Sequence, residues 1–173
     1  KTRIRHRQII NQGIDALIDN GYLGVVTPFL FDEEKKTYLK KYFYIDPGLV
    51  TYLTGFREIE RDLGYRIEGL IYSRLFYKLQ FEITKNKGLY FYKKYTVKSD
   101  GSLRFSKGEV DAIYHSGKLL IPIEIKSTDQ WNSIDTEALE KFVKEKKTNF
   151  ALVFYAGPAM KKKNIIFWPY WLV

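Results

Sequence analysis

The sequence contains no cysteine and only two histidines among its 173 residues. The missing cysteines exclude disulfides, thiolate metal sites and a cysteine nucleophile. No apolar run approaches the roughly 18 residues that a membrane-spanning helix requires. No signal peptide is visible either. We therefore expect a soluble, cytoplasmic protein.

A glycine-rich phosphate loop ending in Gly-Lys-Ser/Thr is also missing, which excludes nucleotide hydrolysis by such a loop in this chain. Positive charge is in excess, because 29 Lys and Arg outnumber 20 Asp and Glu for a formal charge of +9. This excess favours a polyanionic partner, with an acidic membrane surface as the alternative to nucleic acid. We expect DNA, either duplex or branched, and no membrane, as the partner.

The N-terminal third of the chain has the pattern helix, hairpin, helix. Residues 3–19 place their apolar side chains on one helical stripe, and the following Asn-Gly pair predicts a C-cap. Residues 23–31 and 37–45 are two β-rich runs around a polar turn. The Asp-Pro-Gly triplet that opens residues 46–53 predicts a short capped helix. This pattern therefore predicts that residues 1–56 form the latter part of a winged-helix segment.

Residues 65–173 predict a second, mixed segment of helices and strands. A helix over residues 65–81 has a broad apolar face, and Glu68 falls on that face between Leu75 and Leu79. Its carboxylate should therefore point inward. The elements expected after this helix are a strand at 89–95, a polar loop at 99–107, a hairpin at 108–126, a helix at 134–146, and strands at 150–155 and 165–168. The predicted class is α/β (α+β), with the core order αβββαβ.

The hairpin at residues 108–126 carries several charged side chains. Glu124 and Lys126 are two residues apart on one strand and must share a face. A two-residue turn at Ser116 and Gly117 would place Asp111 on that face as well. In this register Glu109 opposes Glu124 and is a possible additional acid. We expect two or three acids and one ammonium group to converge on one patch.

These residue types suit metal-dependent hydrolysis of a phosphodiester. The carboxylates of Asp111, Glu124 and Glu68 are oxygen ligands for a hard cation such as Mg²⁺ or Mn²⁺. Lys126 would then orient or deprotonate a water, or stabilise charge on the phosphorane. On spacing alone, a solvated cross-strand ion pair is the commoner explanation. The apolar neighbours of Glu124 argue against it, because an unneeded charge is costly in a buried strand.

Two groups of basic residues are candidate DNA-binding sites. Arg3, Arg5 and Arg7 crowd the start of the first predicted helix, and four lysines crowd the predicted hairpin turn. Both groups could contact phosphates. The competing explanation is that they are solvated charged ends. The four lysines are Lys35, Lys36, Lys40 and Lys41.

The order of site residues and elements over residues 65–155 resembles that of the PD-(D/E)xK nuclease superfamily. This order is Glu68 on a helix, Asp111 on a strand, Glu124-Ile125-Lys126 on the next strand, and then a helix and a strand. A closer resemblance is to the domain of unknown function at the C-terminus of archaeal and bacterial AAA+ type ATPases. The motifs that carry it are YFYIDPGLVTYLTG, RIEGLIYSRL, GEVDAIYH and IPIEIKS. One departure is Gly108-Glu109-Val110-Asp111, which lacks the Pro-Asp pair that names the superfamily.

The resemblance implies a restriction-endonuclease-like core with an N-terminal winged-helix-like segment. It also implies that Glu68, Asp111, Glu124 and Lys126 are the catalytic residues, with an ATPase module upstream in a longer chain or a stand-alone relative. The leading hypothesis is therefore a Mg²⁺- or Mn²⁺-dependent nuclease-like domain that hydrolyses DNA. The alternatives are a non-catalytic DNA-binding or regulatory module of an ATPase and a protein docking domain.

Overall fold

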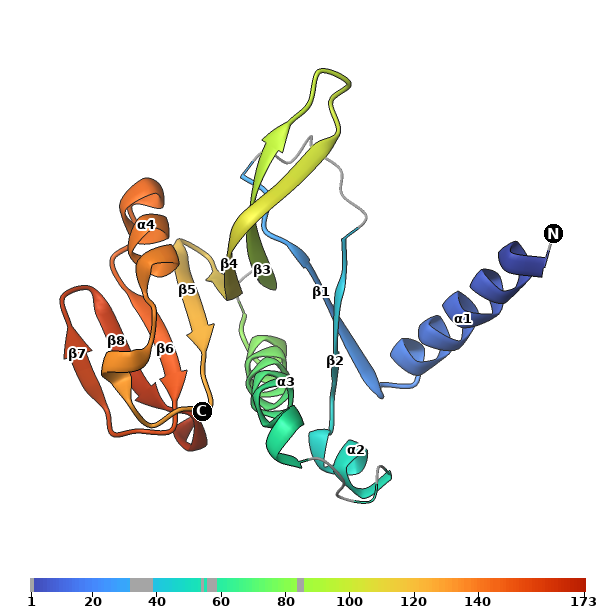
Figure 1. Ribbon diagram of the computed structural model, residues 1–173, viewed down its shortest axis with the longest axis horizontal. Helices are drawn as coiled ribbons and strands as arrows, with labels where there is room; N and C mark the ends of the chain where they lie inside the picture. The colour runs from blue at the N-terminus through green and yellow to red at the C-terminus, as the bar shows by residue number, and fades with distance from the viewer. Residues whose placement is uncertain (1, 32–38, 54, 56–58, 84–85) are drawn as a thin grey trace.

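The computed structural model describes residues 2–31, 39–53, 55, 59–83 and 86–173, and within them the chain forms a mixed α/β structure (Figure 1). The helices are α1 (Thr2–Asp19), α2 (Pro47–Leu53), α3 (Ile59–Gln80) and α4 (Glu137–Lys146). Short 3₁₀ turns occur at Trp131–Ser133 and Tyr170–Leu172. The strands are β1 (Leu23–Pro28), β2 (Lys41–Tyr44), β3 (Lys87–Val97), β4 (Leu103–Ser116), β5 (Leu119–Ile125), β6 (Ala151–Tyr155), β7 (Met160–Lys162) and β8 (Ile165–Pro169).

All eight of these strands belong to one sheet, in the order β2-β1-β3-β4-β5-β6-β8-β7. The β3–β4 and β4–β5 pairs are antiparallel, whereas β5, β6 and β8 run parallel. β1 pairs with β3 in parallel through Thr27 and Pro28. The strands of the N-terminal segment therefore extend the sheet of the rest of the chain. The division into a 1–56 and a 65–173 segment stays a prediction.

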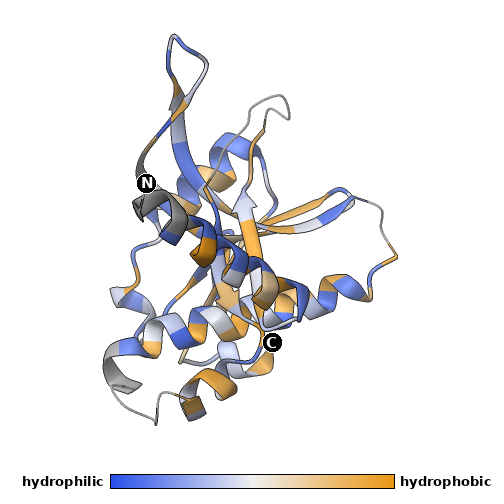
Figure 2. Ribbon diagram, turned by 90° about the vertical axis from the view of Figure 1, so that its right-hand side faces the viewer, coloured by the Kyte–Doolittle hydropathy of each residue, from blue (hydrophilic) through white to orange (hydrophobic). Residues whose placement is uncertain are grey.

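Two hydrophobic clusters cover the two faces of the sheet. On one face, the apolar side of α3, with Ile71 and Leu75, packs against β3 and β5 residues such as Ile123. On the other face, α4 contributes Leu139 and Phe142 to a cluster with β4, β6 and β8. The 3.6-residue period of each helix thus buries one stripe on the sheet. In Figure 2 the strands in the middle of the molecule are mainly coloured hydrophobic.

The sequence predicted the ends of two helices from their capping residues, and both predictions are confirmed. After α1, Gly21 has φ of +74°, and the backbone N–H of Tyr22 donates to Leu17 O over 2.8 Å. Before α2, Asp46 Oδ1 accepts from the N–H groups of Gly48 at 2.8 Å and Leu49 at 3.2 Å. These contacts satisfy backbone groups that a helix end leaves without an intrahelical partner.

The apolar stripe of α1 is largely exposed. Ile10 is 61% exposed and Leu17 is 43% exposed, while Ile14 and Ile18 are only partly buried. Figure 1 shows the reason, because α1 projects from the edge of the molecule and contacts the sheet only near β1. No helix within the described part of the chain is long and apolar enough to cross a membrane.

Three boundaries also differ from those expected. α3 begins at Ile59, and α4 begins at Glu137 after the N-cap residue Thr136. β4 begins at Leu103, inside the predicted polar loop, because Thr96 pairs with Arg104 and the hairpin closes only at residues 98–102. The strand β7 was not predicted, since it has only three residues and two of them are lysines.

The turn between β4 and β5 lies one residue later than predicted. Ser116 pairs with Leu119, so the two turn residues are Gly117 and Lys118. Gly117 has φ of +61°, and a glycine in the first position of a two-residue turn relieves the strain of a positive φ. The register therefore shifts by two residues, which makes Asp111 and Glu124 the next positions facing each other after the Ala112–Ile123 pair.

A β-bulge interrupts β4 beside those acids. Between the Tyr90–Ile113 and Tyr92–Val110 pairs, β3 has one residue and β4 has two, Asp111 and Ala112. Ala112 and Val110 would share a face in a regular strand, as the sequence predicted. The extra residue instead places Ala112 in the cluster with α3 and Val110 in the cluster with α4.

Candidate functional site

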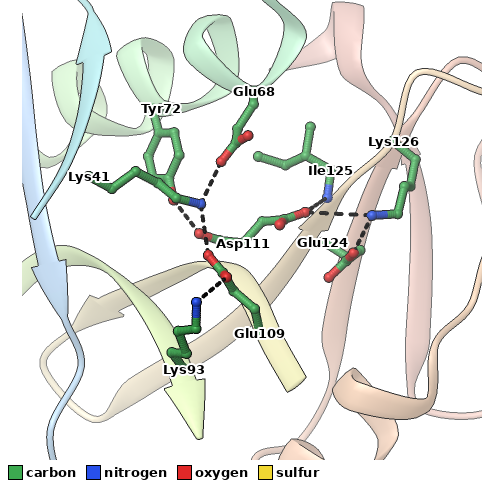
Figure 3. Close-up of polar contacts among 9 residues, drawn as sticks. All are labelled: Lys41, Glu68, Tyr72, Lys93, Glu109, Asp111, Glu124, Ile125 and Lys126. Carbon is green, nitrogen blue, oxygen red and sulfur yellow. Dashed lines mark hydrogen bonds and ion pairs between the residues drawn. The ribbon is translucent and has the colours of Figure 1, made fainter. Parts of the chain in front are cut away.

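Three elements bring the predicted site residues together where β4 and β5 separate (Figure 3). α3 supplies Glu68, β4 supplies Glu109 and Asp111, and β5 supplies Glu124. Lys126 directly follows β5, and its backbone N–H donates to Phe154 O of β6 over 2.9 Å. All the acids and the lysine singled out in the sequence therefore lie in one region of the structure.

Lys126 joins Asp111 and Glu124. Its ammonium group donates a hydrogen bond to Glu124 Oε1 and lies 4.0 Å from Asp111 Oδ2. The side chain of Glu124 is only 11% exposed, whereas that of Lys126 is 40% exposed. The two carboxylates thus meet at one cation, with one of them largely withdrawn from water.

Asp111 also has a structural role at the point where the β4–β5 ladder ends. Its Oδ2 accepts the backbone N–H of Ile125 over 2.8 Å. Its backbone carbonyl accepts a hydrogen bond from the hydroxyl of Tyr72, a buried residue of α3. These contacts replace backbone pairing that the separating strands no longer provide. Asp111 is therefore held in a defined orientation without any ligand.

Lys41 is the site residue whose place the sequence did not indicate. It was predicted to bind phosphates, but its Nζ lies 2.7 Å from Glu68 Oε1 and 3.2 Å from Glu109 Oε1. The cause is the pairing of β2 with β1, which brings the lysine beside Glu68 and Tyr72 in the middle of α3. Lys93 adds a second cation, 3.5 Å from Glu109 Oε2. Only the sheet topology brings these residues together, and no local pattern could have indicated it.

The electrostatics of the cluster favour a cation near Glu124. Burial, together with the negative charge of Asp111, raises the pKa of the Glu124 carboxyl to about 7 although Lys126 acts in the opposite direction. Burial lowers the pKa of Lys126, but contacts with Glu124 and Asp111 outweigh it and leave a net increase. The pKa of Lys41 is raised in the same way, since Glu68 and Glu109 outweigh its burial. Both lysines therefore remain protonated at neutral pH.

The donor set fits the hard cation that the sequence predicted. Asp111, Glu124 and Glu68 offer carboxylate oxygens, which Mg²⁺ and Mn²⁺ prefer. In the described part of the chain, no three His, Cys, Asp or Glu side chains are already grouped as a metal site. The acids are instead divided between two ammonium groups, Lys41 and Lys126. A bound cation would have to compete with these lysines.

The predicted DNA-binding residues fall into separate groups. Arg3, Arg5 and Arg7 lie in α1, but their side chains are outside the described part of the structure. Lys35 and Lys36 lie outside the described residues altogether. Lys40 is described and exposed, whereas its neighbour Lys41 belongs to the acid cluster.

Replacement of Lys41 by Met should destabilise the fold, because it leaves Glu68 and Glu109 facing each other without their shared cation. Met retains the apolar stem beside the rings of Tyr72 and Phe91. For a partly exposed pair we expect a loss of about 1 to 2 kcal/mol in the free energy of unfolding, measured in urea. Lys40→Met is the matched control and should change stability by less than about 0.5 kcal/mol. Equal stability of the two variants would contradict a stabilising role for Lys41.

Comparison of this chain with protein-family models, with curated proteins and with solved structures finds no match in any of the three. The function must therefore be inferred from the geometry of this site and from the motifs in the sequence. The feature that it must explain is the meeting of Asp111, Glu124 and Lys126 beside Glu68.

Proposed function

We propose that this chain is a metal-dependent nuclease domain that hydrolyses phosphodiester bonds in DNA. The observation that carries the proposal is the convergence of Asp111 and Glu124 on the Lys126 ammonium group, at the point where the pairing of β4 with β5 ends. Maintaining a charged pair around the largely buried Glu124 is costly unless the site serves a purpose. Hydrolysis of a phosphodiester gives that arrangement a purpose.

The order of elements supports the proposed fold. From α3 onward the chain runs α3, β3, β4, β5, α4, β6. This order corresponds to the αβββαβ core of the restriction-endonuclease-like fold, to which we assign residues 65–173. The cluster also lies at the carboxyl end of β5, which is parallel to β6. Ligands commonly bind at the carboxyl ends of parallel strands.

Each residue of the cluster has a definite task in this proposal. Asp111 and Glu124 would hold Mg²⁺ or Mn²⁺, with Glu68 as a further oxygen ligand. When bound, the ion would polarise the scissile phosphate and lower the pKa of a water. Lys126 acts as an electrostatic clamp that stabilises the negative charge developing on phosphorus oxygens. Its raised pKa favours this role over that of a general base.

The proposed substrate and partners follow from charge and from the sequence motifs. A formal charge of +9 attracts DNA. The resemblance to the C-terminal domain of AAA+ type ATPases leads us to propose an ATPase module upstream in the same chain. In such a protein, nucleotide hydrolysis would be the task of that module and phosphodiester cleavage the task of this one.

A second candidate function is a non-catalytic DNA-binding or regulatory module. Lys41 favours it, because its ammonium group contacts both Glu68 and Glu109 and gives these acids a structural explanation without metal. The two candidates differ in what they require of divalent cations. A nuclease needs the cation for cleavage, whereas a binding module is indifferent to it.

A cleavage assay on linear, supercoiled, single-stranded and branched DNA separates these candidates. With Mg²⁺ or Mn²⁺ we expect the protein to cleave at least one substrate, and EDTA should stop the reaction. Glu145→Gln is a suitable control, because it removes an exposed carboxylate from α4 and should leave cleavage unchanged. DNA binding without cleavage of any substrate under either cation would favour the second candidate.

A further inference from the structure

The β3–β4 hairpin continues well beyond the sheet. Residues 94–107, here called the β3–β4 arm, follow the last pair at its base, Lys93 with Glu109. In the arm, Tyr95 pairs with Phe105 and Val97 with Leu103 before the turn at residues 98–102 closes it. Figure 1 shows this end of the hairpin projecting away from the helices and from the rest of the sheet.

The two faces of the arm have different chemistry. Strand alternation places Lys94 and Thr96 on one face, Arg104 joins them as the partner of Thr96, and Lys98 follows at the start of the turn. Lys94, Lys98 and Arg104 are all exposed. In Figure 2 the projecting end is largely coloured hydrophilic. The arm therefore presents three exposed positive charges on a narrow two-stranded ribbon, with the carboxylate of Asp100 bonded to Ser102 within the turn.

The base of the arm is part of the candidate site. Glu109, which pairs with Lys93 at that base, is two residues from Asp111 on the same strand. The second irregularity of β4 lies between Glu109 and Phe105, where Gly108 has φ of +105°. At a rise of about 3.3 Å per residue, the arm extends the reach of the molecule by roughly 20 Å from the acids.

We propose that the β3–β4 arm is a DNA-binding ribbon that lies in the major groove of the duplex whose backbone reaches Asp111 and Glu124. This inference rests on the proposed nuclease function and adds that the substrate is duplex DNA. A major groove about 12 Å wide admits a two-stranded β-ribbon. Lys98 and Arg104 near the tip contact phosphates that border the groove, while the base of the arm directs the neighbouring backbone to the acids.

Shape and charge together favour a duplex over other polyanions. A-form RNA has a deep, narrow major groove that does not admit a ribbon of this kind. A single strand has no groove, and its binding would rely on stacking against exposed aromatic rings. The rings of Tyr95 and Phe105 pack against each other across the arm in a tilted arrangement, with centroids 6.1 Å apart, and both residues are only partly exposed.

The experiment measures DNA affinity without divalent cation, so that it does not depend on cleavage. Lys98→Ala combined with Arg104→Ala should weaken binding to a 20-base-pair duplex about tenfold at low salt. It should also reduce the slope of log affinity against log salt by about 1.8, or about 0.9 for each phosphate contact. The control combines Lys118→Ala with Lys161→Ala. These changes remove two exposed charges outside the arm, one in the β4–β5 turn and one in β7. The control should retain affinity within about threefold and leave most of the slope intact.

Groove occupancy needs a second measurement. In dimethyl sulfate footprinting, the unmodified protein should protect guanine N7, which lies in the major groove, and the arm variant should lose that protection. Arm and control variants of equal affinity, absent N7 protection, or no duplex binding at all would each overturn the inference. If the arm and control variants have equal affinity and cleavage is intact, the nuclease proposal stands and the arm is better explained as a binding site for a protein partner. Arm-dependent binding without cleavage would overturn the nuclease proposal alone.

Discussion

Asp111→Asn and Glu124→Gln should each reduce DNA cleavage by at least about a hundredfold. Each change keeps the shape of the side chain but removes a carboxylate that would hold the cation. In the first variant, the amide oxygen of the introduced asparagine would still accept the Ile125 N–H, which Asp111 accepts over 2.8 Å. The backbone at the end of β5 is therefore preserved, and lost activity cannot be attributed to a collapsed strand.

Two further measurements test this explanation. Affinity for duplex DNA in EDTA should stay within about threefold of the unmodified protein, because neither acid contacts phosphate without the cation. Asp111→Ala is a useful contrast, since it leaves the Ile125 N–H without its partner and should also lower stability by about 1 to 3 kcal/mol. Full cleavage activity in Asp111→Asn or Glu124→Gln would remove the basis for the proposed nuclease site.

The second large effect concerns stability and pH. Because burial and Asp111 raise the pKa of Glu124 to about 7, the folded state favours the protonated carboxyl. The unfolded carboxyl titrates near its ordinary pKa of about 4.5. The favourable contribution of the protonated form is therefore complete below pH 4.5 and is lost as the pH rises towards and beyond 7.

Glu124→Gln removes this titration, since its amide is neutral at every pH. At pH 8, in EDTA, we expect the free energy of unfolding of the variant to exceed that of the unmodified protein by about 1 to 3 kcal/mol. At pH 4 the two should be equal, because Glu124 is then protonated in both states. Urea unfolding at pH 4, 6 and 8 measures the difference, with Glu145→Gln as an exposed carboxylate whose replacement should show no such trend.

The opposite sign would be equally informative. If Glu124→Gln lowers stability at pH 8 by several kcal/mol, the Glu124–Lys126 pair is a structural ion pair that the fold depends on. The acids would then need no catalytic explanation, and the non-catalytic module would be the better conclusion. Cleavage and stability thus test the same residue by independent measurements.

Elements with a strong local pattern could be predicted from the sequence. The Asp46 cap and the Gly21 terminus depend on residues close together in the chain, and the structure confirms both of them. The inward position of Glu68 followed from the wheel of α3. Helical periodicity specifies such features because it relates residues only three or four positions apart.

The missed features depend on contacts between distant segments. Lys41 meets Glu68 across 27 residues of sequence, and only the pairing of β2 with β1 makes the contact possible. The turn at Gly117 was placed one residue too early, because a glycine satisfies the backbone demand of either turn position. The length of the arm was missed because its charged residues made strand 103–107 resemble a loop.

The bulge at Asp111 and Ala112 also divides β4 into two halves, one that pairs with β5 and one that leads into the β3–β4 arm. Residues 112–116 are in register with β5, and that register is fixed by the apolar core. On the other side of the bulge, Glu109 and residues 103–105 pair with the outer half of β3, with the second irregularity between them. Since one extra residue absorbs any mismatch between the halves, the arm could lengthen, shorten or change its tip during evolution while the acids kept their positions. Transplanting the acids into another sheet would accordingly require transplanting the irregularity with them.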